Sequence, residues 1–143
     1  MSTQKKIQSY KIIGQTNLLH LEFTDTSYAF PYKKAKFKKM LKVGVDYFES
    51  FLSRRSAHAG WPGLPKGVER VELHIQFVGA SKIKSLNRDF RGKDYTTDVL
   101  SFALEEDLRQ MEIAYSPYVN LGDIIVCREK ALSQAKKFNI SVE

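Results

Sequence analysis

An uninterrupted apolar run near the C-terminal end constrains the fold more than any other feature of this sequence. Ile124, Ile125 and Val126 follow one another within the segment 121–127. Successive side chains of a strand point to opposite faces of a sheet, so a run without polar positions is typical of a central strand covered on both faces. The run therefore predicts a sheet with other elements packed against it.

Alternation and helical spacing predict the remaining elements. Between Val71 and Phe77 apolar residues alternate with polar ones, which predicts a strand with one apolar face. Together with the run above, the expected strands are residues 18–23, 71–77, 99–104 and 121–127. The expected helices are residues 32–52, 81–90 with Ser81 as the cap, and 128–138. We expect one domain over residues 1–143, of α+β (α/β-like) class, with a mixed four-stranded sheet packed with helices.

The charge of the chain favours a polyanionic partner. The 143 residues carry a net charge of +7, and the pI is near 9.5. Nucleic acid is the commonest partner for such a chain, and a solvated basic surface is the alternative. The basic residues concentrate in two clusters, which are Lys33, Lys34, Lys36, Lys38, Lys39 and Lys42, and Lys82, Lys84, Arg88, Arg91 and Lys93.

The compartment is predicted from cysteine use and from the apolar segments. Cys127 is the one cysteine, which excludes an internal disulfide and suits a reducing compartment. We expect its side chain to be buried in the core. The N-terminus has no signal-peptide pattern, and no segment approaches the roughly 20 apolar residues that span a bilayer. A soluble, cytoplasmic protein with no membrane partner is expected.

Two motifs carry a resemblance to a known family. Residues 85–102 read SLNRDFRGKDYTTDVLSF, and residues 121–127 read LGDIIVC, followed by an alanine-rich helix. Both segments closely resemble the YbeY family of bacterial rRNA maturation endoribonucleases, from about Leu18 to Glu143. Ala103 departs from the family pattern, which usually has proline there.

The resemblance also implies a third motif that this chain lacks. Family members carry an H-G-x-L-H-L-x-G-Y-D-H pattern further on, whose three histidines hold a metal normally assigned as zinc. His20, His58 and His74 lie on separate predicted elements without metal-ligand spacing, so we expect no metal ligands and no tight zinc binding in this chain. The last residues, from Ser141 to Glu143, look like a helix start, so we expect the natural protein to continue and this domain to be incomplete; a frayed tail is the alternative.

The resemblance assigns roles within the first motif. It places Arg91 in the cleft near the metal, where its guanidinium can bind two phosphate oxygens and stabilise charge as the catalytic and substrate-binding residue. A loop salt bridge to Asp94 or Asp98 is the structural alternative. Lys93 is a second substrate-binding candidate. Asn87 and Asp98 are candidates for organising the loop, and Asp123 is either a buried structural acid or a partner that orients a metal ligand.

The function that the resemblance implies is a metal-dependent, single-strand-specific endoribonuclease in rRNA maturation and ribosome quality control. Its expected partners are rRNA and ribosome-associated proteins. A non-catalytic RNA- or ribosome-binding module and a metal hydrolase of another substrate are the alternatives. We also expect that the absent C-terminal motif leaves apolar surface on the sheet uncovered.

Overall fold

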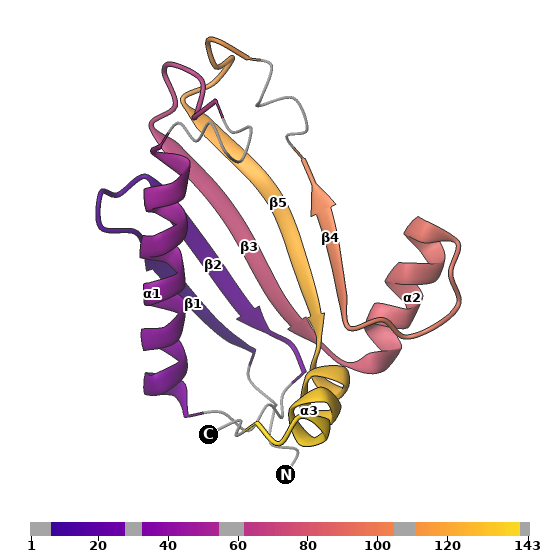
Figure 1. Ribbon diagram of the computed structural model, residues 1–143. Coiled ribbons are helices and arrows are strands. Elements are labelled where there is room, and N and C mark those ends of the chain that lie inside the picture. Colours follow the sequence, from indigo (N-terminus) through magenta and orange to yellow (C-terminus); the bar gives the residue numbers. More distant parts are fainter. Residues whose placement is uncertain (1–6, 28–32, 55–61, 105–110, 141–143) are drawn as a thin grey trace.

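A computed structural model describes residues 7–27, 33–54, 62–104 and 111–140 of the chain. It is an α+β single domain with a mixed sheet and three helices, as expected from the sequence (Figure 1). The strands are β1 (Gln8–Ile13), β2 (Leu19–Asp25), β3 (Arg70–Val78), β4 (Val99–Ala103) and β5 (Tyr118–Cys127). The helices are α1 (Lys34–Leu52), α2 (Ala80–Arg91) and α3 (Arg128–Lys137).

The sheet has five strands rather than the four expected, because β1 was missed. β1 is an edge strand that pairs antiparallel with β2. Ile12 and Ile13 are adjacent in it, so one points into the core and the other is 40% exposed, which breaks the alternation that marks a strand. Edge strands also often carry charged side chains, as β1 does at Lys11, so the apolar signal of such a strand is weak.

The strand order is β1-β2-β3-β5-β4, and β5 lies inside the sheet as its apolar run predicted. β2, β3 and β5 are parallel neighbours, while β1 and β4 pair antiparallel at the two edges. Parallel neighbours need a crossover, and α1 supplies the one between β2 and β3. This order places the α2 helix and the segment after it next to the β4 edge (Figure 1).

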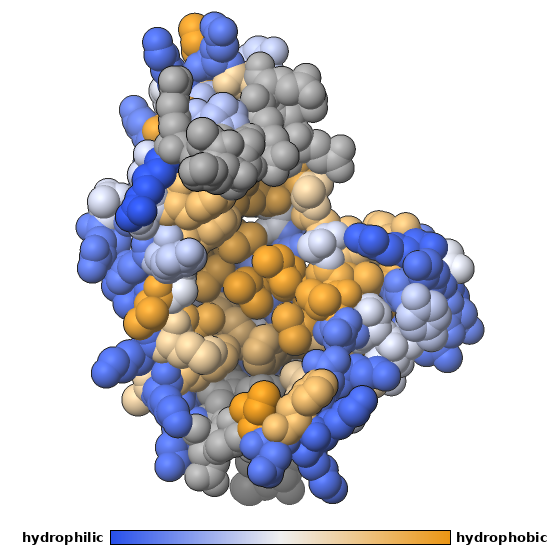
Figure 2. Space-filling model, in the orientation of Figure 1, coloured by the Kyte–Doolittle hydropathy of each residue, from blue (hydrophilic) through white to orange (hydrophobic). Residues whose placement is uncertain are grey.

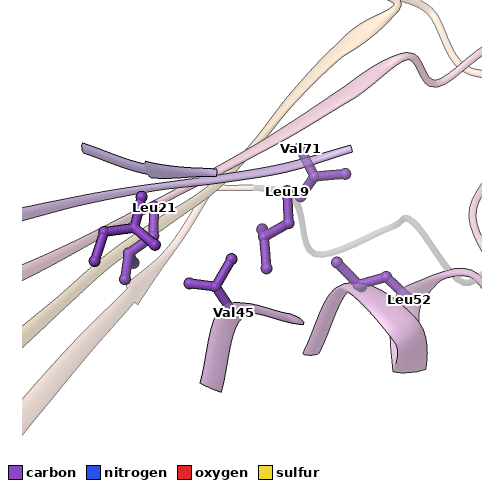
Figure 3. Close-up of a cluster of buried hydrophobic side chains, with 6 residues drawn as sticks. Leu19, Leu21, Val45, Leu52 and Val71 are labelled. Atoms are coloured by element: carbon purple, nitrogen blue, oxygen red, sulfur yellow. The ribbon is translucent and has the colours of Figure 1, made fainter. Parts of the chain in front are cut away.

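One core cluster joins α1 to the sheet. Leu19, Leu21 and Val71 point from β2 and β3 toward Val45 and Leu52 of α1 (Figure 3). All five side chains are buried. Burial of one such side chain contributes about 1.5–3 kcal/mol, so this cluster fixes α1 on the β1–β2 half of the sheet.

A second core cluster lies on the opposite face, under α2. It consists of Val78, Ile83, Leu100, Ile125 and Cys127. Ile125 pairs with Gln76, whose side chain points away from the face that Val71 and Leu73 share, so this cluster belongs to the other face. Cys127 is fully buried, as expected, and burial raises the pKa of its thiol.

The face that carries α1 stays partly open over the central strands. Figure 2 shows apolar side chains gathered over the sheet between α1 and α2. Ile75, Ile124 and Val126 are only half-buried there although their strands are central, and Val99 is 47% exposed. α1 packs on β1 and β2 and leaves this part of the face uncovered.

The helix ends differ in detail from the predictions. Gly79, not Ser81, precedes the first turn of α2, and it provides no side-chain cap. α3 has no buried residue, and Phe138, the last residue of the expected helix, lies just after α3 and is exposed. Asn139 follows in the left-handed conformation (φ 54°), which is common after the end of a helix.

Several predictions fall outside the described residues. They are the start of the first helix at residue 32, His58 and the helix start at residues 141–143. None of the helices within the described part of the chain is both long enough and apolar enough to cross a bilayer.

Candidate functional site

Arg91 and Lys93 lie together at the outer edge of β4. Arg91 is the last residue of α2, not the first residue of a loop as predicted. Gly92 follows in the left-handed conformation (φ 67°), which ends the helix and turns the chain so that Lys93 stays near Arg91. Both residues line one open recess of about 650 Å³ with Phe90, Ser101, Phe102, Ala103 and Leu104.

The Arg91 side chain is held in this recess by the backbone of β4. Its Nη2 donates a hydrogen bond to the carbonyl oxygen of Ser101 at 2.9 Å. The predicted alternative partner Asp94 instead lies 3.8 Å from Lys84 and 4.0 Å from Arg88. A guanidinium has five N–H donors, so a single bond to Ser101 leaves others to bind an anion.

Asn87 supports the turn that carries Lys93. Its side chain is buried, and its Nδ2 donates to the carbonyl of Tyr95 at 2.9 Å. The Lys93 amide donates to the Asn87 carbonyl at 3.2 Å. These two bonds fold residues 92–95 back onto α2, so Asn87 positions the loop from beneath it.

Asp98 supports the other end of the same loop. Its Oδ1 accepts from the Val99 amide at 2.9 Å, and its Oδ2 accepts from Gln134 Nε2 of α3 at 3.2 Å. The Gln134 bond, followed by the backbone bonds, lowers the pKa of Asp98, so this carboxylate is ionised at neutral pH. Asp98 therefore links the start of β4 to α3.

The second basic cluster of the sequence is exposed, and two of its members, Arg91 and Lys93, line the recess. All five basic residues of this cluster, along α2 and the turn after it, are exposed: Lys82, Lys84, Arg88, Arg91 and Lys93. Arg88 and Lys84 share the carboxylates of Asp89 and Asp94. Arginine and lysine at such an edge can bind phosphate oxygens, and an exposed guanidinium binds two of them at once.

A second polar recess lies on the sheet face that α1 does not cover. His20 and Glu22 of β2 line it with Glu72 and His74 of β3 and with Asp123 of β5. The parallel register brings them together, since His20 pairs with Glu72 and Glu22 pairs with His74. We predicted that the histidines lie apart on separate elements. In each strand, however, the histidine is two residues from a glutamate, and residues at this spacing point to the same face of a sheet.

A glycine bulge directs Asp123 into this recess. Glu72 pairs with Asn120 and His74 with Asp123, so β5 has one extra residue at this point. Gly122 adopts φ 110°, and a Cβ on it would collide with the carbonyl oxygen of Phe102. Asp123 Oδ1 lies 2.8 Å from His74 Nδ1, and its side chain is half-exposed rather than buried.

This recess does not fit a zinc site with three protein ligands. His74 has both ring nitrogens engaged, with Asp123 on one side and Thr24 Oγ1 at 3.1 Å on the other. Within the described ranges, no three His, Cys, Asp or Glu side chains are placed to hold one metal ion. Tight zinc binding needs at least three such ligands, so we derive no chemical step through a metal.

Glu49 is a buried acid that sequence reasoning missed. It lies in α1, and its carboxylate accepts from the amides of Thr16 (2.7 Å), Leu18 (2.9 Å) and Leu19 (2.9 Å) in the β1–β2 turn. Burial opposes ionisation of Glu49, but the hydrogen bonds from Leu19, Thr16 and Leu18 outweigh it and lower its pKa. Glu49 therefore has a structural role, remote from the Arg91 recess.

Comparison with known proteins gives one consistent family. The model of the endoribonuclease YbeY family matches residues 33–143. The endoribonuclease YbeY of Staphylococcus carnosus is 49% identical over 73 residues, which cover 51% of this chain and 47% of that protein. The Macrococcus caseolyticus protein of the same name is 44% identical over 75 residues, with 52% and 48% covered.

These matches cover only part of each protein. A third endoribonuclease YbeY, from Alkaliphilus metalliredigens, is 43% identical over 87 residues, covering 61% of this chain and 51% of that protein. The chain thus spans about half the length of the curated relatives it matches. The solution structure of TM1509 from Thermotoga maritima superimposes with a TM-score of 0.42 at 26% identity, over 92% of this chain and 61% of that one.

Proposed function

The chain belongs to the endoribonuclease YbeY family, and from that premise we propose that it contributes the phosphate-binding side of a single-strand-specific endoribonuclease that acts in rRNA maturation. Its substrate is RNA, and ribosome-associated proteins are its further partners. The proposal includes a role in ribosome quality control and a cytoplasmic location. The +7 charge supports a polyanionic substrate of this kind.

The observation that carries the proposal is the placement of Arg91. Its guanidinium is fixed at one corner by the Ser101 carbonyl and lies in an open recess with Lys93. Cleavage of a phosphodiester builds negative charge on the phosphate oxygens, and a preoriented cation stabilises that charge without reorganising. Arg91 binds the scissile phosphate in this proposal, and Lys93 neutralises an adjacent one.

Metal dependence is part of the proposal through the family. In the complete family architecture, a bound zinc would lower the pKa of a water molecule and so provide the nucleophile. Among the described residues, no three His, Cys, Asp or Glu side chains lie close enough together to hold one metal ion. What this chain's own residues do is bind and orient the RNA backbone, and that step needs no metal.

RNA binding tests the proposal directly. Arg91→Ala should weaken binding of a single-stranded RNA and reduce the slope of log affinity against log salt by about 0.7, the value for one phosphate contact on a single strand. Arg91→Lys should keep most of the salt slope but lose affinity, because an ammonium cannot bind two oxygens at once. Arg54→Ala removes an exposed arginine at the end of α1 and serves as the matched control.

An RNA cleavage assay distinguishes the proposed endoribonuclease from a non-catalytic binding module. In a family protein that carries the three-histidine motif, the arginine to alanine change at this position should abolish cleavage while the protein stays folded. Unchanged cleavage and unchanged binding would refute the role of Arg91. Binding without cleavage in every form of the protein would favour the alternative, a non-catalytic RNA- or ribosome-binding module.

A further inference from the structure

Phe90 is exposed although it lies on the apolar side of α2. It follows Ile83 and Leu86 along one side of α2, and Ile83 is fully buried in the second core cluster. Phe90 itself is 68% exposed. α2 lies beside the β4 edge of the sheet (Figure 1). In its last turn the apolar side of the helix meets β4 at Phe102 only, so that most of the Phe90 ring stays exposed.

The ring of Phe90 is oriented by Phe102 of β4. The two ring centroids are 5.3 Å apart, and the planes meet at 73°, an edge-to-face contact. A contact of this geometry restrains the Phe90 ring without a parallel partner on its faces. The result is a fixed aromatic ring with a face open to solvent.

Cations flank this ring. Phe90 lines the same recess as Arg91 and Lys93, next to the Ser101 carbonyl that holds the guanidinium. Single-stranded nucleic acids are bound by such pairs, in which cations hold the backbone and an exposed aromatic ring stacks on a base. A purely apolar protein partner would have to bury the two cations, which is costly without paired acids.

We propose that Phe90 is a stacking platform for an unpaired base of the RNA whose phosphates Arg91 and Lys93 bind. This inference rests on the proposed function and adds the reason for its single-strand specificity. A base can reach the Phe90 ring only if it has left its helix, because paired bases are stacked on their neighbours. Stacking is tolerant of sequence, so Phe90 selects unpaired RNA and not a particular base.

The test compares three variants on two ligands. Phe90→Leu keeps an apolar side chain but removes the ring, Phe90→Trp keeps a ring that stacks, and Tyr47→Leu removes an exposed aromatic residue from α1 as the control. The ligands are a short single-stranded RNA that contains a fluorescent purine analogue, and inorganic polyphosphate, which has phosphates and no bases. Affinity, quenching of the purine fluorescence and thermal unfolding are measured for each protein.

Phe90→Leu should weaken RNA binding by about tenfold and abolish the quenching, since the loss of one base stack has an effect of that order. The affinity of this variant for polyphosphate should not change. Unchanged polyphosphate binding would show that the substitution has not disturbed the Arg91 site. Phe90→Trp should retain the RNA affinity, and Tyr47→Leu should match the unchanged protein.

Each other outcome overturns the inference in a distinct way. If the unchanged protein binds RNA and Phe90→Leu binds it equally well, stacking is refuted while the proposed function stands. If Phe90→Leu loses polyphosphate as well as RNA, Phe90 only supports the fold of the recess. If the unchanged protein binds no RNA at low salt, both the inference and the proposed function fail.

Discussion

Replacing Glu49 with glutamine should destabilise the fold by roughly 3 kcal/mol. The side chain keeps its size, but it loses its charge and one of the two acceptor oxygens. If the remaining oxygen faces Leu18 and Leu19, the new amide group points its N–H donors at the Thr16 amide. A hydrogen bond to a charged group contributes about 1.5–3 kcal/mol, and a buried donor left without a partner costs about 1–3 kcal/mol.

Thermal and denaturant unfolding measure this change. For a chain of this length, a loss of roughly 3 kcal/mol lowers the melting temperature by about 6–12 °C. Asp46→Asn is the control on the same helix, because it removes a partly exposed ion pair with Lys42. Such a pair contributes at most about 1 kcal/mol, so the control should unfold close to the unchanged protein.

The pH dependence gives an independent check on the charge of Glu49. Its pKa is lower in the folded chain than the ordinary value of 4.5. The stability that it contributes is therefore fully present above about pH 4.5, and it is lost as the pH falls through the folded pKa. Glutamine has no such dependence, so the two proteins should converge in stability in acid. A glutamine variant as stable as Asp46→Asn, or a difference that is constant with pH, would refute the reasoning.

Two further predictions concern the bulge and the metal. Gly122→Ala should destabilise the chain by at least about 2 kcal/mol in denaturant titration, because φ is positive there and the new Cβ would collide with Phe102. Gly44→Ala in α1 is the control, since a Cβ there has open space and should stabilise the chain by about 0.5–1 kcal/mol. Equal effects of the two substitutions would contradict this prediction. Metal analysis should find no stoichiometric zinc on the 143-residue chain, and a chain extended through a three-histidine motif should gain it; zinc bound tightly by the short chain would overturn the site assignment.

The fold was largely predictable because its signals are local. The Ile124–Val126 run placed β5 inside the sheet, and the alternation at Val71–Phe77 predicted β3, since both patterns report how neighbouring side chains divide between two faces. β1 was missed because an edge strand buries little. β1 is recognisable as a strand only from its antiparallel pairing with β2 in the structure.

The site was less predictable because its geometry depends on long-range pairing. The motif pointed to Arg91 and Lys93, but nothing local indicated that Arg91 would bind the Ser101 carbonyl across the β4 edge. The spacing of Ile83, Leu86 and Phe90 along one side of the helix does not indicate that Phe90 stays exposed beside β4. Glu49 gave no signal at all, since the amides that it binds lie about thirty residues earlier in the chain.

The position of β4 has a consequence for how copies of this protein meet in solution. β4 is one of the two edge strands, and the outward backbone groups of such a strand can pair with a strand of another molecule. Arg91 occupies one of these groups, the Ser101 carbonyl, and places a charge along the edge. The residue that we propose for phosphate binding therefore also discourages self-association through this edge.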